Sequence, residues 1–157
     1  MKDLNYDSID IAGYIINKCI CLNYDTGYTK VQKLLYACYG VVLALFDARL
    51  TVEHPKAWQY GPAFPRAFTA QHKSKIDYNN LTRIDEQLKK DTIKDAIDDT
   101  IAYFGKFTAV ALVTWSHKPS SPWAASSNNG LDLFKNIPDE LIKSYFQSHV
   151  LKKSEQE

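Results

Sequence analysis

The sequence has almost no net charge, because 19 Lys and Arg residues face 18 Asp and Glu residues, which leaves +1 at pH 7. Proteins that bind DNA or RNA normally carry an excess of basic residues, so this composition does not favour a nucleic-acid partner. Only three cysteines occur, Cys19, Cys21 and Cys38, and this odd, irregularly spaced set argues against a secreted disulfide framework. The first ten residues, MKDLNYDSID, lack the apolar core of a signal peptide. We therefore expect a cytoplasmic protein.

Motifs of common catalytic and cofactor sites are missing as well. There is no CxxC or HxxxH pair, and the histidines are scattered, so we predict no metal site. Neither GxxxxGK[ST] nor GxGxxG is present, so we predict no nucleotide or other cofactor. Ser116 and His117 are neighbours whose side chains diverge on a helix, which prevents a nucleophile–base pair between them. These absences predict no catalytic residues and a protein that is not an enzyme; the alternative is a small phage or mobile-element hydrolase or transferase that uses His117 or a cysteine.

Apolar residues follow helical periods and form no run long enough to span a membrane. The most apolar segment, KVQKLLYACYGVVLALF at residues 30–46, contains Lys33 and Gly40 and predicts a core helix surrounded by other helices. Further helical patterns cover residues 9–22, 66–72, 86–106, 108–117 and 138–151. We predict a mainly α fold in one compact domain, residues 1–157, with about six or seven helices. At most one short β ribbon is expected, made by Leu50–Val52 and Lys56–Trp58, and residues 151–157 are expected to form a frayed tail.

The core helix carries two further expectations. Thr29 and Gln32 have the spacing of a capping box, which predicts that Thr29 opens the helix. One side of the helix carries small residues between charged ones: Lys33, Ala37, Gly40, Ala44 and Asp47. Because small side chains let another backbone approach closely, this stripe predicts a contact with a neighbouring helix or with a partner protein.

Two turns are unusually rich in aromatic residues and proline. AWQYGP contains Trp58 and Tyr60, and TWSHKPSSPW contains Trp115, His117 and Trp123. Such aromatic residues either close a hydrophobic core, with indole N–H groups bonded to nearby carbonyls, or anchor a protein-binding surface. We interpret His117 as a hydrogen-bonded support of the second turn rather than as a general base.

Together with the core helix, these turns resemble the Panacea domain, the SocA-like or GepA-like antitoxin family of bacteria and their phages. TKVQKLLYACYGVVLAL, EHPKAWQYGPAFPRAF, TWSHKPSSPW and IPDELIKSYF follow the family's order, and the resemblance runs from the first helix to about Phe146. The residues that match the family's motif positions are Gln32, Lys33, Leu34, Leu35, Tyr36, Ala57, Trp58, Gly61, Pro62, Ser116, His117, Pro122 and Trp123. The sequence departs from the family pattern at Ala63, where valine is usual, and at Trp115, where an aliphatic residue is usual.

The resemblance implies an antitoxin that neutralises a cognate protein toxin, encoded by an adjacent gene, by direct binding. A protease or chaperone is the lesser alternative as a partner, and the oligomeric state is left open. We expect partner contacts from Lys33, Tyr36, Trp58, Tyr60, Arg66, Trp115, His117 and Trp123. The remaining motif residues, Gln32, Leu34, Leu35, Ala57, Gly61, Pro62, Ser116 and Pro122, are expected to serve the structure. A DNA-binding autoregulator is a third possibility, against which the near-neutral charge speaks.

Overall fold

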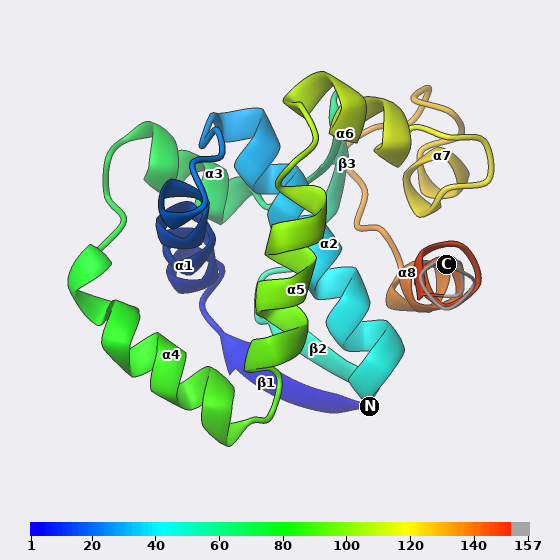
Figure 1. The fold of residues 1–157 in the computed structure, drawn as a ribbon. Coiled ribbons are helices and arrows are strands. Elements are labelled where there is room, and N and C mark those ends of the chain that lie inside the picture. The colour runs from blue at the N-terminus through cyan, green and yellow to red at the C-terminus, as the bar shows by residue number, and fades with distance from the viewer. Residues whose placement is uncertain (152–157) are drawn as a thin grey trace.

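The computed structural model describes residues 1–151 and is built around one central helix, α2, as Figure 1 shows. The elements are β1 (Lys2–Tyr6), α1 (Ser8–Cys21), α2 (Tyr28–Phe46), β2 (Ala48–Thr51), β3 (Lys56–Trp58), β4 (Gly61–Ala63), α3 (Pro65–His72), the 3₁₀ turn η1 (Tyr78–Asn80), α4 (Leu81–Lys90), α5 (Lys94–Phe104), α6 (Ala109–Ser116), α7 (Pro122–Ser126), α8 (Asp139–Tyr145) and the π-helical turn η2 (Phe146–Leu151). The mainly α fold is therefore confirmed. Of the tail predicted for residues 151–157, only Leu151 belongs to the described residues, where it ends η2.

Helix α2 forms the centre of the hydrophobic core. Every residue from Lys30 to Leu43 is buried, because α1, α3, α5, α6 and α8 all pack against this helix. By length and composition α2 is apolar enough to cross a membrane, but 78% of its most apolar window is buried inside the protein, as in the core helix of a globular domain. The capping-box prediction was wrong, because the N-cap is Gly27 and no side chain caps the helix. The Gln32 side chain is used elsewhere, as described below.

The stripe of small residues on α2 is covered by the C-terminal segment of the same chain. A β-carbon built at Gly40 would lie 2.5 Å from Cε1 of Phe146 and closer still to two other atoms of that ring. Next to this contact, Gln147 Nε2 donates to the Ala44 carbonyl oxygen at 3.3 Å. Lys143 Nζ pairs with Asp47 Oδ1 at 2.8 Å. The stripe therefore serves close helix–helix packing within this protein.

Two small strand pairs complete the fold, and their pairing differs from the prediction. Strand β2 pairs in parallel with β1, and β3 pairs antiparallel with β4. The predicted ribbon between Leu50–Val52 and Lys56–Trp58 was therefore wrong. Parallel neighbours require a long crossover connection, and here α1 and α2 together form it between β1 and β2. The polar segment KDLNY of β1 shows no clear alternation of apolar and polar residues, which is why no strand was predicted there.

The charged helix predicted over residues 86–106 is two helices, α4 and α5, which accounts for a helix beyond the expected number. Thr92 between them has φ +59. The Thr92 N–H donates to the Lys89 carbonyl at 3.0 Å, and the Ile93 N–H donates to the Leu88 carbonyl at 3.1 Å. This pair of bonds is a Schellman motif, which usually has glycine at the left-handed position. Because threonine takes that position here, the sequence carried no signal of the break.

Candidate functional site

The β3–β4 hairpin is held on one side by two buried polar side chains of α2. Gln32 Oε1 accepts the Phe64 N–H at 2.6 Å, and Lys33 Nζ donates to the Pro62 carbonyl at 3.1 Å. Both side chains belong to residues that are only 2% exposed. Because burial disfavours the charged form of an amine, the pKa of Lys33 is lowered to about 8. The hairpin therefore covers a lysine whose charge is poorly solvated.

The turn after α6 holds the other side of the hairpin. His117 Nε2 lies 3.1 Å from the Gln59 carbonyl oxygen, and its Nδ1 lies 2.9 Å from the Val113 carbonyl oxygen. Trp123 Nε1 donates to the Trp58 carbonyl at 2.7 Å. The His117 and Trp123 rings meet edge to face, with centroids 3.9 Å apart and an interplanar angle of 88°. The rings of His117 and Trp123 therefore fix the hairpin loop to α6 and α7 through their nitrogen atoms.

Gly61 is the point where both sides come closest. Its φ of +106 falls where residues with a β-carbon are strained. A β-carbon there would collide with Ser116 Oγ and lie 2.8 Å from Cε of Lys33. We refer to Gln32, Lys33, Ser116, His117 and Trp123, which surround the hairpin, as the hairpin clamp. The motif residues, which lie far apart in the sequence, thus meet at one place in the fold.

The residues expected to contact a partner differ widely in exposure. Lys33 and Tyr36 are 2% exposed and Trp123 is 7% exposed, so these three face the interior. Trp58, Trp115 and His117 are half-buried. Tyr60 is 63% exposed, and the exposed Arg66 pairs with Asp7 at 2.9 Å. Whether any of them contacts a partner stays a prediction.

Most side chains that the enzyme alternative needs are hydrogen-bonded to the main chain or buried, the exception being the exposed Cys21. Both ring nitrogens of His117 face main-chain carbonyl oxygens, and the Ser116 hydroxyl donates to the Val113 carbonyl at 2.9 Å. Cys19 and Cys38 are buried, and burial raises the pKa of both thiols, which disfavours the reactive thiolate. Within residues 1–151, no three His, Cys, Asp or Glu side chains are grouped so that they could hold a metal ion.

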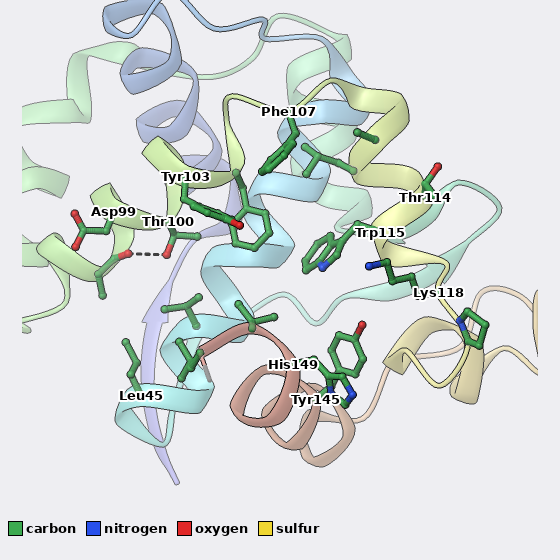
Figure 2. A pocket seen from close by; sticks show the side chains of 18 residues that line it. Leu45, Asp99, Thr100, Tyr103, Phe107, Thr114, Trp115, Lys118, Tyr145 and His149 are labelled. Atoms are coloured by element: carbon green, nitrogen blue, oxygen red, sulfur yellow. Dashed lines mark hydrogen bonds between the residues drawn. The ribbon is translucent and has the colours of Figure 1, made fainter. Parts of the chain in front are cut away.

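An apolar groove of about 1030 Å³ lies beside the clamp, between α2, α5, α6 and η2 (Figure 2). Its walls are mainly aromatic and aliphatic: Val41, Leu45, Tyr103, Phe104, Phe107, Leu112, Trp115 and Tyr145. Trp115 joins groove and core, since its ring lies 4.9 Å from that of Phe104 and 5.9 Å from that of Tyr36, centroid to centroid.

Two charged residues border this groove on different helices. Asp99 lies at the α5 margin, and Lys118, which follows α6, lies at the opposite margin in Figure 2. Within the part of the chain that the structure describes, neither side chain has an ion-pair partner. Sequence reasoning missed this groove. The available signal was the pair Tyr103 and Phe107, two aromatic residues four positions apart that do not belong to the buried stripe of α5.

Comparisons with known proteins agree with this geometry. Residues 31–124 match the family described as Antitoxin SocA-like, Panacea domain. The matched range begins in α2 and ends in α7, and thus contains the whole hairpin clamp. Antitoxin SocA of Caulobacter vibrioides (strain NA1000 / CB15N) is 26% identical over 162 residues, which cover 90% of this chain and 82% of that protein. No solved structure matches the chain. Since the matched range spans more than half of the sequence, this chain belongs to the SocA-like Panacea domain family of antitoxins.

Proposed function

We propose that this protein is the antitoxin of a toxin–antitoxin system and neutralises a protein toxin, encoded by an adjacent gene, by direct binding in the cytoplasm. The observation that carries this proposal is the family match over residues 31–124, which includes every residue of the hairpin clamp. The relative from Caulobacter vibrioides is itself named an antitoxin.

The geometry supports binding rather than chemistry. The polar side chains of the clamp form hydrogen bonds with main-chain groups of the same chain. The adjacent groove, in contrast, presents aromatic side chains to solvent. Exposed, rigid aromatic residues are favoured anchors of protein interfaces. Among the predicted contact residues, Tyr60, Trp58, Trp115 and Arg66 reach the surface, and we propose that these touch the toxin. The buried Lys33, Tyr36 and Trp123 then act indirectly, by holding the hairpin and α6 in place. His117 does the same, because both of its ring nitrogens face main-chain carbonyls.

Co-expression tests the proposal. The neighbouring open reading frame is induced in a bacterial host, alone and together with this protein. We expect growth arrest in the first case, and recovery with a co-purifying complex in the second. If the neighbour is harmless alone and no complex is recovered, the antitoxin function is wrong.

Purified components separate direct neutralisation from delivery to a protease or chaperone. An equimolar amount of this protein should inhibit the purified toxin with no third component present. Inhibition that needs an added protease would contradict direct neutralisation while leaving the antitoxin role intact.

A further inference from the structure

The apolar groove exposes large side chains that the fold itself leaves partly uncovered. Leu45 is 51% exposed, Tyr103 is 49% exposed and Phe107 is 37% exposed, and all three line the same hollow. Folded proteins seldom leave a contiguous apolar surface of this kind without a binding role. Lys106 Nζ lies 4.4 Å from the centroid of the Tyr103 ring and 5.5 Å from that of the Phe107 ring.

The walls of the groove indicate the kind of segment that fits. All of the groove's described lining residues come from helices and the turns that follow them, and none belongs to a strand. An extended segment would find no strand edge there to pair its backbone groups, whereas a helix bonds its own backbone internally. A helix about 10 Å wide encloses roughly 420 Å³ per turn. The 1030 Å³ of the groove thus accommodates about two helical turns.

The two unpaired charges define a direction for such a helix. Asp99 and Lys118 border opposite margins of the groove, and neither has an ion-pair partner among the described residues. In Figure 2 the amino group of Lys118 extends toward the hollow, near Trp115. The N-terminal end of a helix carries partial positive charge and its C-terminal end partial negative charge. A docked helix is therefore favoured with its first turn beside Asp99 and its last turn beside Lys118.

We propose that the toxin inserts one apolar helix into the groove between α2, α5, α6 and η2, with its N-terminal end beside Asp99 and its C-terminal end beside Lys118. This inference rests on the proposed antitoxin function. The helix presents apolar side chains toward Tyr103, Phe107 and Trp115. It carries a basic residue in its first turn or an acidic residue in its last, which would complement the charges at the two margins.

A pair of matched variants tests the docking site. Tyr103→Glu places a charge in the groove, and Tyr78→Glu places the same charge on a tyrosine that is 47% exposed and does not line the groove. The probe is the purified protein encoded by the neighbouring gene. We expect Tyr103→Glu to raise the Kd at least tenfold and to abolish growth protection, with Tyr78→Glu within twofold of wild type. Circular dichroism melts of both variants verify folding.

The outcomes distinguish the two proposals. Absence of binding and protection by the wild-type protein would mean that the antitoxin function itself is wrong. If the wild type binds and Tyr103→Glu binds equally well, only the groove is wrong as the docking site. Should Tyr103→Glu fail to fold, Leu45→Glu replaces it, with Ile20→Glu, at a residue that is 64% exposed on α1, as its control.

A photo-reactive residue tests what occupies the groove. With p-benzoylphenylalanine at Phe107, we expect a cross-link to a toxin segment that is helical, identified by mass spectrometry of the linked peptides. Lys118→Glu should weaken binding at least threefold at low salt, and the effect should shrink as salt is added. A cross-link to a second copy of this chain, or to a non-helical toxin segment, would overturn the proposed occupant.

Discussion

The ring of Phe146 rests on the backbone of α2 at Gly40, with no side chain between them. This contact lies in the middle of the small-residue stripe and is accompanied by the ion pair between Lys143 and Asp47. Phe146 also meets the rings of Tyr36 and Trp115, at centroid distances of 5.5 and 6.0 Å. The last helical segment therefore packs on α2 through the Phe146 ring. This packing is possible only because Gly40 has no β-carbon.

Gly40→Ala should destabilise the protein although alanine is the better helix former. The added methyl group overlaps the Phe146 ring, and such overpacking costs about 1–3 kcal/mol, which we expect to exceed the gain of about 1 kcal/mol in helix propensity. Urea unfolding measures the change. Gly13→Ala in α1 is the control, because its β-carbon would meet Cγ2 of Ile76 at 2.9 Å, a methyl group on a half-buried side chain outside a helix. Equal stability of the two variants would contradict the close contact.

His117→Ala should lower the free energy of unfolding by about 1–3 kcal/mol, because the turn loses a ring that faces the Val113 and Gln59 carbonyls and packs edge to face on Trp123. Thermal melts and urea titrations provide the measurement. His72→Ala, at an exposed position stacked on Phe68, is expected to change stability by less than about 1 kcal/mol. The enzyme alternative predicts the reverse pattern: lost activity at an unchanged melting temperature.

Lys33 should make the stability of the protein depend on pH. Its pKa is lowered from 10.5 to about 8 in the folded state, so below pH 8 the lysine is charged both folded and unfolded and its burial is unfavourable. Between pH 8 and 10.5 the unfolded chain binds more protons than the folded one, and stability attributable to Lys33 therefore rises with pH. Relative to Lys33→Met, the wild type should gain roughly 3 kcal/mol across this window.

Comparing wild type with Lys33→Met at pH 7 and pH 10 cancels the titration of the tyrosines that both proteins share. The free energy of unfolding of each is measured by urea titration at both pH values. A difference between the two proteins that stays constant with pH would show that Lys33 is solvated in the folded state.

Asp139→Ala should be among the most destabilising charge removals in the chain. The Asp139 carboxylate accepts bonds from Tyr39 Oη at 2.6 Å and from Arg49 Nη2 at 2.7 Å, and the residue is 8% exposed. Its loss leaves the hydroxyl of the buried Tyr39 without its acceptor, whereas Arg49 is partly solvated and keeps its pair with Asp3, so we expect a cost of about 1–3 kcal/mol. Asp132→Ala removes an exposed pair with Lys135 and should cost at most about 1 kcal/mol. Comparable losses in denaturant unfolding would contradict the burial of the Asp139 network.

The fold class followed from the sequence because helical periods are local. The apolar surround of residues 30–46 predicted a core helix, and its small residues predicted a close neighbour, which Phe146 provides. The parallel pairing of β1 with β2 could not be predicted in this way, since it depends on where two intervening helices return the chain. The break at Thr92 was hidden because a threonine adopts the backbone conformation usually left to glycine.

The candidate site was predictable as a set of residues but not as an arrangement. The resemblance to the antitoxin family identified Lys33, His117 and Trp123, yet their burial depends on a hairpin from another part of the chain that covers them. A lysine in a helix is ordinarily expected to be exposed. The burial of Lys33 is explained by its hydrogen bond to the Pro62 carbonyl, which lies 29 positions away in the sequence. Tyr103 and Phe107 are the opposite case, because these aromatic side chains are 49% and 37% exposed although aromatic residues are mostly found in the core.

The four walls of the apolar groove are made at very different times during synthesis. Helix α2 supplies the first wall near residue 41, whereas η2, which ends at Leu151, supplies the last. A nascent chain that has emerged only through α6 lacks the residues of η2, so it cannot yet form the complete groove. The groove is therefore complete only in a chain that has been made through η2.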